Sequence, residues 1–223
     1  MRRVSIGMTV LVACRLGAQT FINLGFEQAV IQPRDPTFGF LEWGLAVPGW
    51  SHSTGLDTET VYYGATHLGG SQYFLLVDRF SRLHSPLELS HSLAFASGFD
   101  TGDPAGRWVN AYISQTGLIP EFAQSLHFEA TGNFGVGVNN NVMAIYSLGG
   151  NTYAVDVSAY AGTVAELTVL NTSGPLDFTP ALVDAFTFSS TPVPEPKALG
   201  VLGLAIVTAW AVWRRRFKGA CVQ

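Results

Sequence analysis

The sequence predicts an all-β fold, an antiparallel β-sandwich of the jelly-roll kind, followed by one C-terminal transmembrane helix. Between residues 19 and 190, strand-like runs of about five to ten residues alternate with turn signals. From Leu87 to Phe95, bulky apolar side chains occupy every second position, which is the period of a half-buried strand. No long stretch of this body has helical periodicity. The helix is predicted instead at residues 198–213, which are apolar and uncharged.

Eight segments of the body carry the strand pattern, and turns rich in Gly, Asn or Pro separate them. They are Gln72–Val77, Leu87–Phe95, Trp108–Ser114, Ser125–Ala130, Val142–Leu148, Thr152–Val157, Glu166–Leu170 and Leu182–Phe188. The junction Gly149–Asn151 is a hairpin signal, because its residues accept positive φ at little cost. About eight to ten strands without an internal repeat predict one jelly-roll domain.

The N-terminus has the features of a secretory signal peptide. Arg2 and Arg3 precede an apolar stretch from Val4 to Ala13, and small residues follow up to Ala18. We therefore expect residues 1–18 to be removed by cleavage after Ala18. Alternatively, Leu11–Cys14 has the form of a lipoprotein box, in which Cys14 would become the lipidated N-terminus.

The C-terminus has three consecutive parts. Residues 191–197 form a Pro-rich linker that contains Pro194, Glu195 and Pro196. Residues 198–213 would span roughly 24 Å as a helix, a thin membrane span at ~1.5 Å per residue. Residues 214–223 form a basic tail, whose cations are Arg214, Arg215, Arg216 and Lys218. Cations directly after an apolar span stay on the cytoplasmic side, so we expect the body to lie across the inner membrane.

This order of Pro-Glu-Pro, apolar helix and arginine cluster resembles the PEP-CTERM sorting signal of Gram-negative bacteria that make exopolysaccharide. The resemblance implies a partner, the membrane-embedded transpeptidase called exosortase, which cuts near the tripeptide. It also implies transient anchoring in the inner membrane and delivery to the cell surface or extracellular matrix. Prolines exclude helix, so the motif would be extended at the membrane face. An ordinary C-terminal anchor with a Pro-rich linker is the alternative.

Cysteine and charge usage limit the function classes of the body. Both cysteines, Cys14 and Cys221, lie in the two removable ends, so the mature body would hold no disulfide and no thiol nucleophile. Residues 19–193 contain four of the twelve basic residues and fifteen of the sixteen acids, which gives a net charge near −11. This charge argues against nucleic acid as a partner and suits divalent cations or neutral glycans.

The two ends of the body carry a second, shorter resemblance. Asn23–Glu27, Pro48–Trp50 and Val183–Phe186 are similar to the opening and closing strands of galactose-binding-like and carbohydrate-binding β-sandwich modules. In such modules a Glu of the first strand and an Asp of the last help to hold a structural calcium ion. The resemblance implies that Glu27 and Asp184 take these places, unless Glu27 is solvated and Asp184 only ends a strand.

Exposed aromatic rings are the usual means of binding sugars, because a flat ring stacks on the apolar face of a pyranose. Most aromatic residues of an all-β domain are nevertheless buried in its core. We expect Trp50 to be a core residue, since it belongs to the second resemblance. Trp43, Tyr62 and Tyr63 are the candidate ligand-binding residues, for which a polysaccharide is the expected ligand.

Enzymatic activity has little support in the sequence. The chain lacks a nucleophile elbow, a zinc-protease His pair, a P-loop and a dinucleotide-binding glycine pattern. The stretch Asp100–Asp103 is interpreted as a turn, since it lacks the further acids of an EF-hand loop. We therefore expect a non-enzymatic protein of the cell surface or matrix. The alternative is a secreted glycoside hydrolase built from dispersed carboxylates such as Glu88 and Glu129.

Overall fold

A computed structural model of the chain describes residues 19–31, 39–53, 60–63, 72–81, 84–99 and 105–193. It confirms a mostly-β fold in which two sheets rich in antiparallel pairs form a sandwich. The predicted signal peptide, sorting motif, membrane helix and basic tail, and the Asp100–Asp103 turn, lie outside the described residues. Among the residues that are described, no helix has the length and apolar character needed to cross a membrane.

The larger sheet has eight strands, and all neighbours in it are antiparallel except β3 and β4, which are parallel. Its spatial order is β1 (Gly39–Glu42), β3 (Thr60–Tyr63), β4 (Tyr73–Asp78), β5 (His91–Ala96), β15 (Ala181–Ser189), β9 (Ser125–Gly132), β13 (Thr152–Asp156) and β12 (Ile145–Gly149). The strands from the first half of the chain thus form one part of the sheet, and β15 joins them to the second half.

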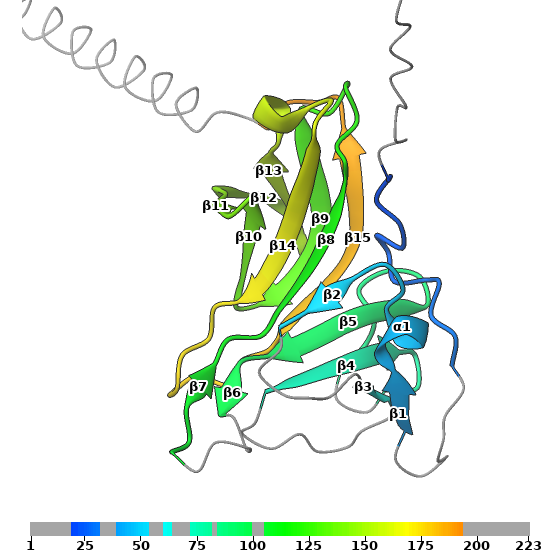
Figure 1. Ribbon diagram of the computed structural model, residues 1–223, viewed down its shortest axis with the longest axis vertical. Helices are drawn as coiled ribbons and strands as arrows, with labels where there is room; N and C mark the ends of the chain where they lie inside the picture. The colour runs from blue at the N-terminus through cyan, green and yellow to red at the C-terminus, as the bar shows by residue number, and fades with distance from the viewer. Residues whose placement is uncertain are drawn as a thin grey trace, which may run out of the picture.

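The smaller sheet has five strands in the order β11 (Asn141–Val142), β10 (Phe134–Val138), β14 (Val164–Asn171), β8 (Tyr112–Leu118) and β2 (Ser51–His52). Figure 1 shows β14 and β8 lying over β9 and β15 of the larger sheet. The remaining elements are short: the ribbon of β6 (Gly98–Phe99) and β7 (Trp108–Val109), the helix α1 (Trp43–Ala46) and the 3₁₀ helix η1 (Ser158–Tyr160).

Alternation along the strands fills the space between the sheets. In β14, Ala165, Leu167 and Val169 are buried while the residues between them are half-buried, and in β9 Leu126, Phe128 and Ala130 do the same. Successive side chains of a strand point to opposite faces, so each sheet contributes one apolar face to the core.

An aromatic cluster closes the core beside the N-terminal segment. Phe26 lies with its ring centroid 5.6 Å from that of Trp50 and 6.5 Å from that of Phe186. Trp50 is only 4% exposed, and its indole Nε1 donates to the Asn23 carbonyl at 3.1 Å, so its predicted place in the core is confirmed. The residues that carry the second resemblance therefore come from three distant segments and pack together.

The last strand, β15, holds the larger sheet together. Residues Ala181–Val183 pair with β5 on one side and with β9 on the other. The register with β9 shifts between Asp184 and Thr187, and Ala185 has a φ of 53°. Such a bulge bends the strand and re-aims the side chains next to it. Asp184 is thereby placed where the pairing with β5 has ended.

Three predicted strands have different bounds in the structure. The strand expected from Leu87 begins only at His91, because Leu89 has a φ of 46° and is 77% exposed. Trp108–Ser114 is divided between β7 and β8, and Val142–Leu148 between β11 and β12. In the last case the chain crosses from one sheet to the other, which hydrophobic alternation alone does not reveal. Strands β1, β2, β3, β6 and β10 were not predicted.

Replacing Gly132 by Ala should destabilise the fold far more than replacing Gly150 by Ala. Both glycines have positive φ, 80° and 58°, which costs an Ala about 1–2 kcal/mol. A Cβ at Gly132 would also lie 1.8 Å from the Pro180 carbonyl oxygen, whereas the space at Gly150 is open. Urea unfolding should give a loss above about 3 kcal/mol for Gly132→Ala. Equal losses in the two variants would contradict this packing.

Candidate functional site

The structure brings the predicted pair Glu27 and Asp184 to the same short segment, residues 88–92, which precedes and begins β5. Asp184 is 1% exposed. Its Oδ2 accepts hydrogen bonds from the Glu88 backbone N–H at 3.1 Å and from the Ser92 hydroxyl at 2.7 Å. Its Oδ1 accepts from the Ala185 N–H at 2.7 Å. Asp184 therefore does more than end a strand, because its carboxylate links β15 to the residues that lead into β5.

Glu27 holds the same segment from the N-terminal side. Its Oε1 accepts from the backbone N–H groups of Ser90 at 2.9 Å and His91 at 2.8 Å. Its Oε2 lies 3.6 Å from His91 Nδ1, an atom that is buried and makes no hydrogen bond with the described residues. We name Glu27 and Asp184 the carboxylate pair, and residues 88–92 the clasped segment.

Unusual backbone geometry positions the carboxylate pair. Asn23 and Phe26 have positive φ values of 52° and 54°, and Asn23 Oδ1 closes their loop by accepting from the Gln28 N–H at 3.0 Å. A Cβ placed on Gly25 would lie 3.9 Å from Asp184 Oδ1 and 4.0 Å from Glu27 Cγ. The backbone of Gly25 thus passes close to both acidic side chains.

The surroundings of Asp184 disfavour the charged form of its carboxyl group. Burial raises its pKa to about 6, and the negative charge of Glu27 acts in the same direction. Hydrogen bonds from Ser92, Ala185 and Glu88 oppose this rise only in part. A buried acid next to a second acid gains stability from a proton or from a cation.

The pair fits the structural calcium that the second resemblance implies. Calcium takes about six to eight oxygen ligands, and it accepts backbone carbonyls and water beside carboxylates. Among the described residues, Asp184 Oδ1 accepts a hydrogen bond from Ala185 alone and Glu27 Oε2 accepts none, so each side chain has an oxygen with acceptor capacity towards a cation. In the described part of the chain no group of three or more Asp, Glu, His or Cys residues is placed to hold a metal. The remaining ligands would therefore be carbonyls and water.

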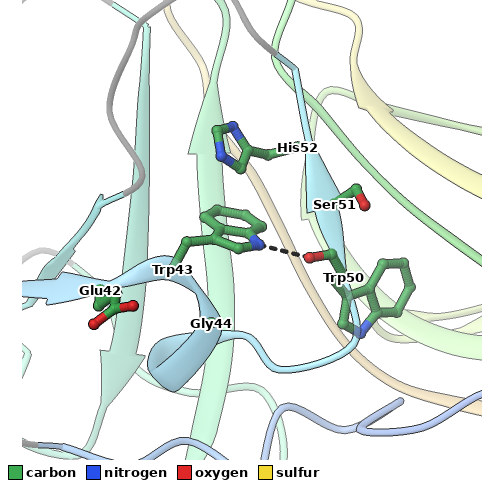
Figure 2. Close-up of a pocket in the computed structure, with 6 residues that line it drawn as sticks. All are labelled: Glu42, Trp43, Gly44, Trp50, Ser51 and His52. Atoms are coloured by element: carbon green, nitrogen blue, oxygen red, sulfur yellow. Dashed lines mark hydrogen bonds between the residues drawn. The ribbon is translucent and has the colours of Figure 1, made fainter.

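Trp43, a predicted ligand-binding residue, lies in the wall of a pocket of about 360 Å³ with Glu42, Trp50 and His52. Figure 2 shows its indole Nε1 bonded to the Trp50 carbonyl, at 2.6 Å, with the His52 ring above it. The two ring centroids are 4.2 Å apart, and Phe74 meets Trp43 edge-on at 5.1 Å. Trp43 is 8% exposed, so its faces are used by the fold and offer no free surface for a sugar.

Tyr62 and Tyr63 point to opposite faces of β3. Tyr62 packs on a small apolar cluster of Leu75, Val77, Ala94 and Leu182, and its ring centroid is 4.9 Å from that of Phe40. Tyr63 lines a second pocket, of about 470 Å³, that borders the clasped segment. Its hydroxyl donates to Asp78 Oδ2 at 2.8 Å. Tyr63 thus lines a pocket in which its hydroxyl bonds a side-chain carboxylate.

The two acids of the alternative hydrolase, Glu88 and Glu129, are both backbone neighbours of Asp184. Glu88 reaches Asp184 through its backbone N–H, and Glu129 is the Cα partner of Asp184 in the β9–β15 pairing. Both contacts involve backbone atoms.

Sequence reasoning missed two polar residues, Ser92 and Asp78. The Ser92 hydroxyl donates to Asp184 of the carboxylate pair, and Asp78 accepts from the Tyr63 hydroxyl in the second pocket. Both are polar residues within or at the end of apolar strands, which is the signal that could have identified them.

Comparisons with known proteins leave the chain without a family assignment. No protein-family model matches it, and no curated protein or solved structure is significantly similar to it.

In the presence of a chelator, the protein should gain stability as the pH falls from 7.5 to 5. The folded-state pKa of Asp184, about 6, exceeds the ordinary value of 3.8, so the folded state binds a proton more tightly in this range. The gain from this group is about 1 kcal/mol at pH 5 and is absent above pH 7.

Urea unfolding at both pH values measures this gain, with Asp184→Asn as the test and the exposed Asp156→Asn as the matched control. For the Asp184 variant, the difference in unfolding free energy between pH 5 and pH 7.5 should be about 1 kcal/mol smaller than for the wild type. For the Asp156 variant this difference should be unchanged. Identical pH dependence in all three proteins would show that Asp184 is not a destabilised carboxylate.

Proposed function

We propose that this chain is an exported, non-enzymatic protein of the cell surface or extracellular matrix, sorted and cleaved through its C-terminal Pro-Glu-Pro motif. The observation that carries the proposal is the distance between the folded body and the motif. Gln124 N–H donates to the Ser189 carbonyl at 2.8 Å, and Ser125 Oγ donates to the Thr191 carbonyl at 2.6 Å. The body is thus held in place up to Thr191, and Pro194 follows within three residues.

This spacing suits a substrate of a membrane-embedded transpeptidase. The apolar run begins at residue 198, so the motif lies between a folded domain and a membrane span with few residues to spare. Proline disfavours helix, which suits a motif that an enzyme must reach. An exosortase-type enzyme would then find its target at a fixed height above the inner membrane. The leader at residues 1–18 and the cations of residues 214–218 give the same orientation.

We further infer that the sandwich is a jelly roll of the galactose-binding-like kind, stabilised by calcium. The support is the joint packing of Phe26, Trp50 and Phe186 beside the carboxylate pair, because the resemblance rests on those same segments. Calcium sites of extracellular modules bind at roughly 10⁻⁴–10⁻³ M. A site of this affinity would fill after export, and the matrix polysaccharide is the expected partner of the mature body.

Calcium should raise the stability of the full-length protein, and Glu27→Gln should abolish the effect. Gln keeps an oxygen for the amides of Ser90 and His91 but removes the negative charge. At a hundredfold excess over Kd, calcium should stabilise the wild type by about 2.7 kcal/mol. Thermal unfolding in calcium and in chelator measures the difference, with Glu166→Gln as the control. Equal calcium responses in wild type and Glu27→Gln would refute the site.

Processing is tested by intact mass and location of the protein in its native host. Wild type should occur outside the cell without residues 197–223, whereas Glu195→Ala should remain full-length in the inner membrane. Ser190→Ala, which changes an exposed residue outside the motif, should behave as wild type. If wild type and Glu195→Ala both stay full-length in the membrane, the tail is a plain anchor and the proposed function fails.

A further inference from the structure

The pocket that contains Tyr63 has the size and composition of a small-ligand site. Its volume of about 470 Å³ lies within the ~300–1,000 Å³ typical of such sites. Tyr63 of β3, Asp78 at the end of β4, and Arg79 and Phe80 in the turn that follows form one side. Ser90 and His91 of the clasped segment form the other.

A fixed pair of polar groups lies in this pocket. Asp78 is 7% exposed, and its Oδ2 accepts from Tyr63 while its Oδ1 accepts from the Phe80 N–H at 2.8 Å. Each carboxylate oxygen retains acceptor capacity, and so does the Tyr63 oxygen. Burial, together with the hydrogen bond to Asp78, raises the pKa of Tyr63 to about 12, so the hydroxyl stays protonated. The pair therefore presents oriented acceptors at physiological pH.

An exposed aromatic ring stands next to these acceptors. Phe80 is 70% exposed although the Arg79 guanidinium lies over its ring, 4.6 Å from the centroid. Within the described residues Arg79 forms no ion pair, so its N–H donors are available. The pocket thus combines an apolar ring face, carboxylate and phenol acceptors, and guanidinium donors.

We propose that this pocket binds one pyranose unit of an uncharged glycan. Sugar hydroxyls both donate and accept, so adjacent hydroxyls can bond Asp78 and Arg79 together, while the C–H face of the ring packs on Phe80. An uncharged glycan is favoured because residues 19–193 carry a net charge near −11, which repels an acidic polymer. The inference rests on the proposed function, since export is what brings the body to a matrix glycan.

The carboxylate pair also determines the far wall of the pocket. Glu27 fixes the amides of Ser90 and His91, and both residues line the pocket. Ligand binding and the geometry of the carboxylate pair are therefore linked through the clasped segment.

The test uses full-length protein purified in a zwitterionic detergent without a sugar headgroup, with calcium present. Retardation in native gels containing galactomannan, mannan, dextran or polygalacturonate reports glycan binding. The variants are Tyr63→Phe, which removes one hydroxyl, and Phe80→Ala. The control is Phe122→Ala, at a Phe that is 57% exposed and outside the pocket. Circular dichroism melting of each variant verifies folding.

At least one uncharged polymer should retard the wild type and Phe122→Ala equally. Phe80→Ala should weaken that binding at least about tenfold, as truncation of a central aromatic contact does, and Tyr63→Phe should weaken it in the same direction. Binding of polygalacturonate alone, binding unaffected by Phe80→Ala, or no binding to any of the four polymers would overturn the proposal. None of these results depends on processing, which the Glu195→Ala experiment in the host measures separately.

Discussion

The fold depends on one buried carboxylate at a bend in its last strand. Asp184 follows the residues through which β15 pairs with both β5 and β9, and its oxygens bond the clasped segment that leads into β5. The interaction joins a strand from the end of the chain to one from its first half. Because the acid is buried beside Glu27, this fastening is strained unless a proton or a cation compensates the charge.

That requirement connects the interior of the protein to its proposed location. Calcium is scarce inside cells and plentiful outside, so a weak two-carboxylate site would be completed only after export. The clasped segment would then be fixed by Glu27 and Asp184 on one side and would present Ser90 and His91 to the pocket on the other. The proposed calcium site and the proposed glycan pocket would thus both depend on the clasped segment.

The sequence was informative where local pattern and structure agree. Alternation located β4, β9, β13, β14 and β15 to within one or two residues, because their inward faces are continuous. It failed at Leu87–Ser90, where the apolar alternation continues but the amides of Glu88 and Ser90 bond carboxylates instead of a neighbouring strand. The resemblance named Glu27 and Asp184, which the structure brings to one segment. The pocket at Asp78 required the parallel β3–β4 pairing, which no local pattern encodes.

A crystal structure grown in calcium, with anomalous scattering recorded at long wavelength, tests the central claim most directly. The account predicts an anomalous peak within calcium-ligand distance, about 2.3–2.6 Å, of an oxygen of Glu27 and an oxygen of Asp184. A structure in which millimolar calcium is present but both carboxylates bond only amides and hydroxyls, with no peak between them, would contradict it.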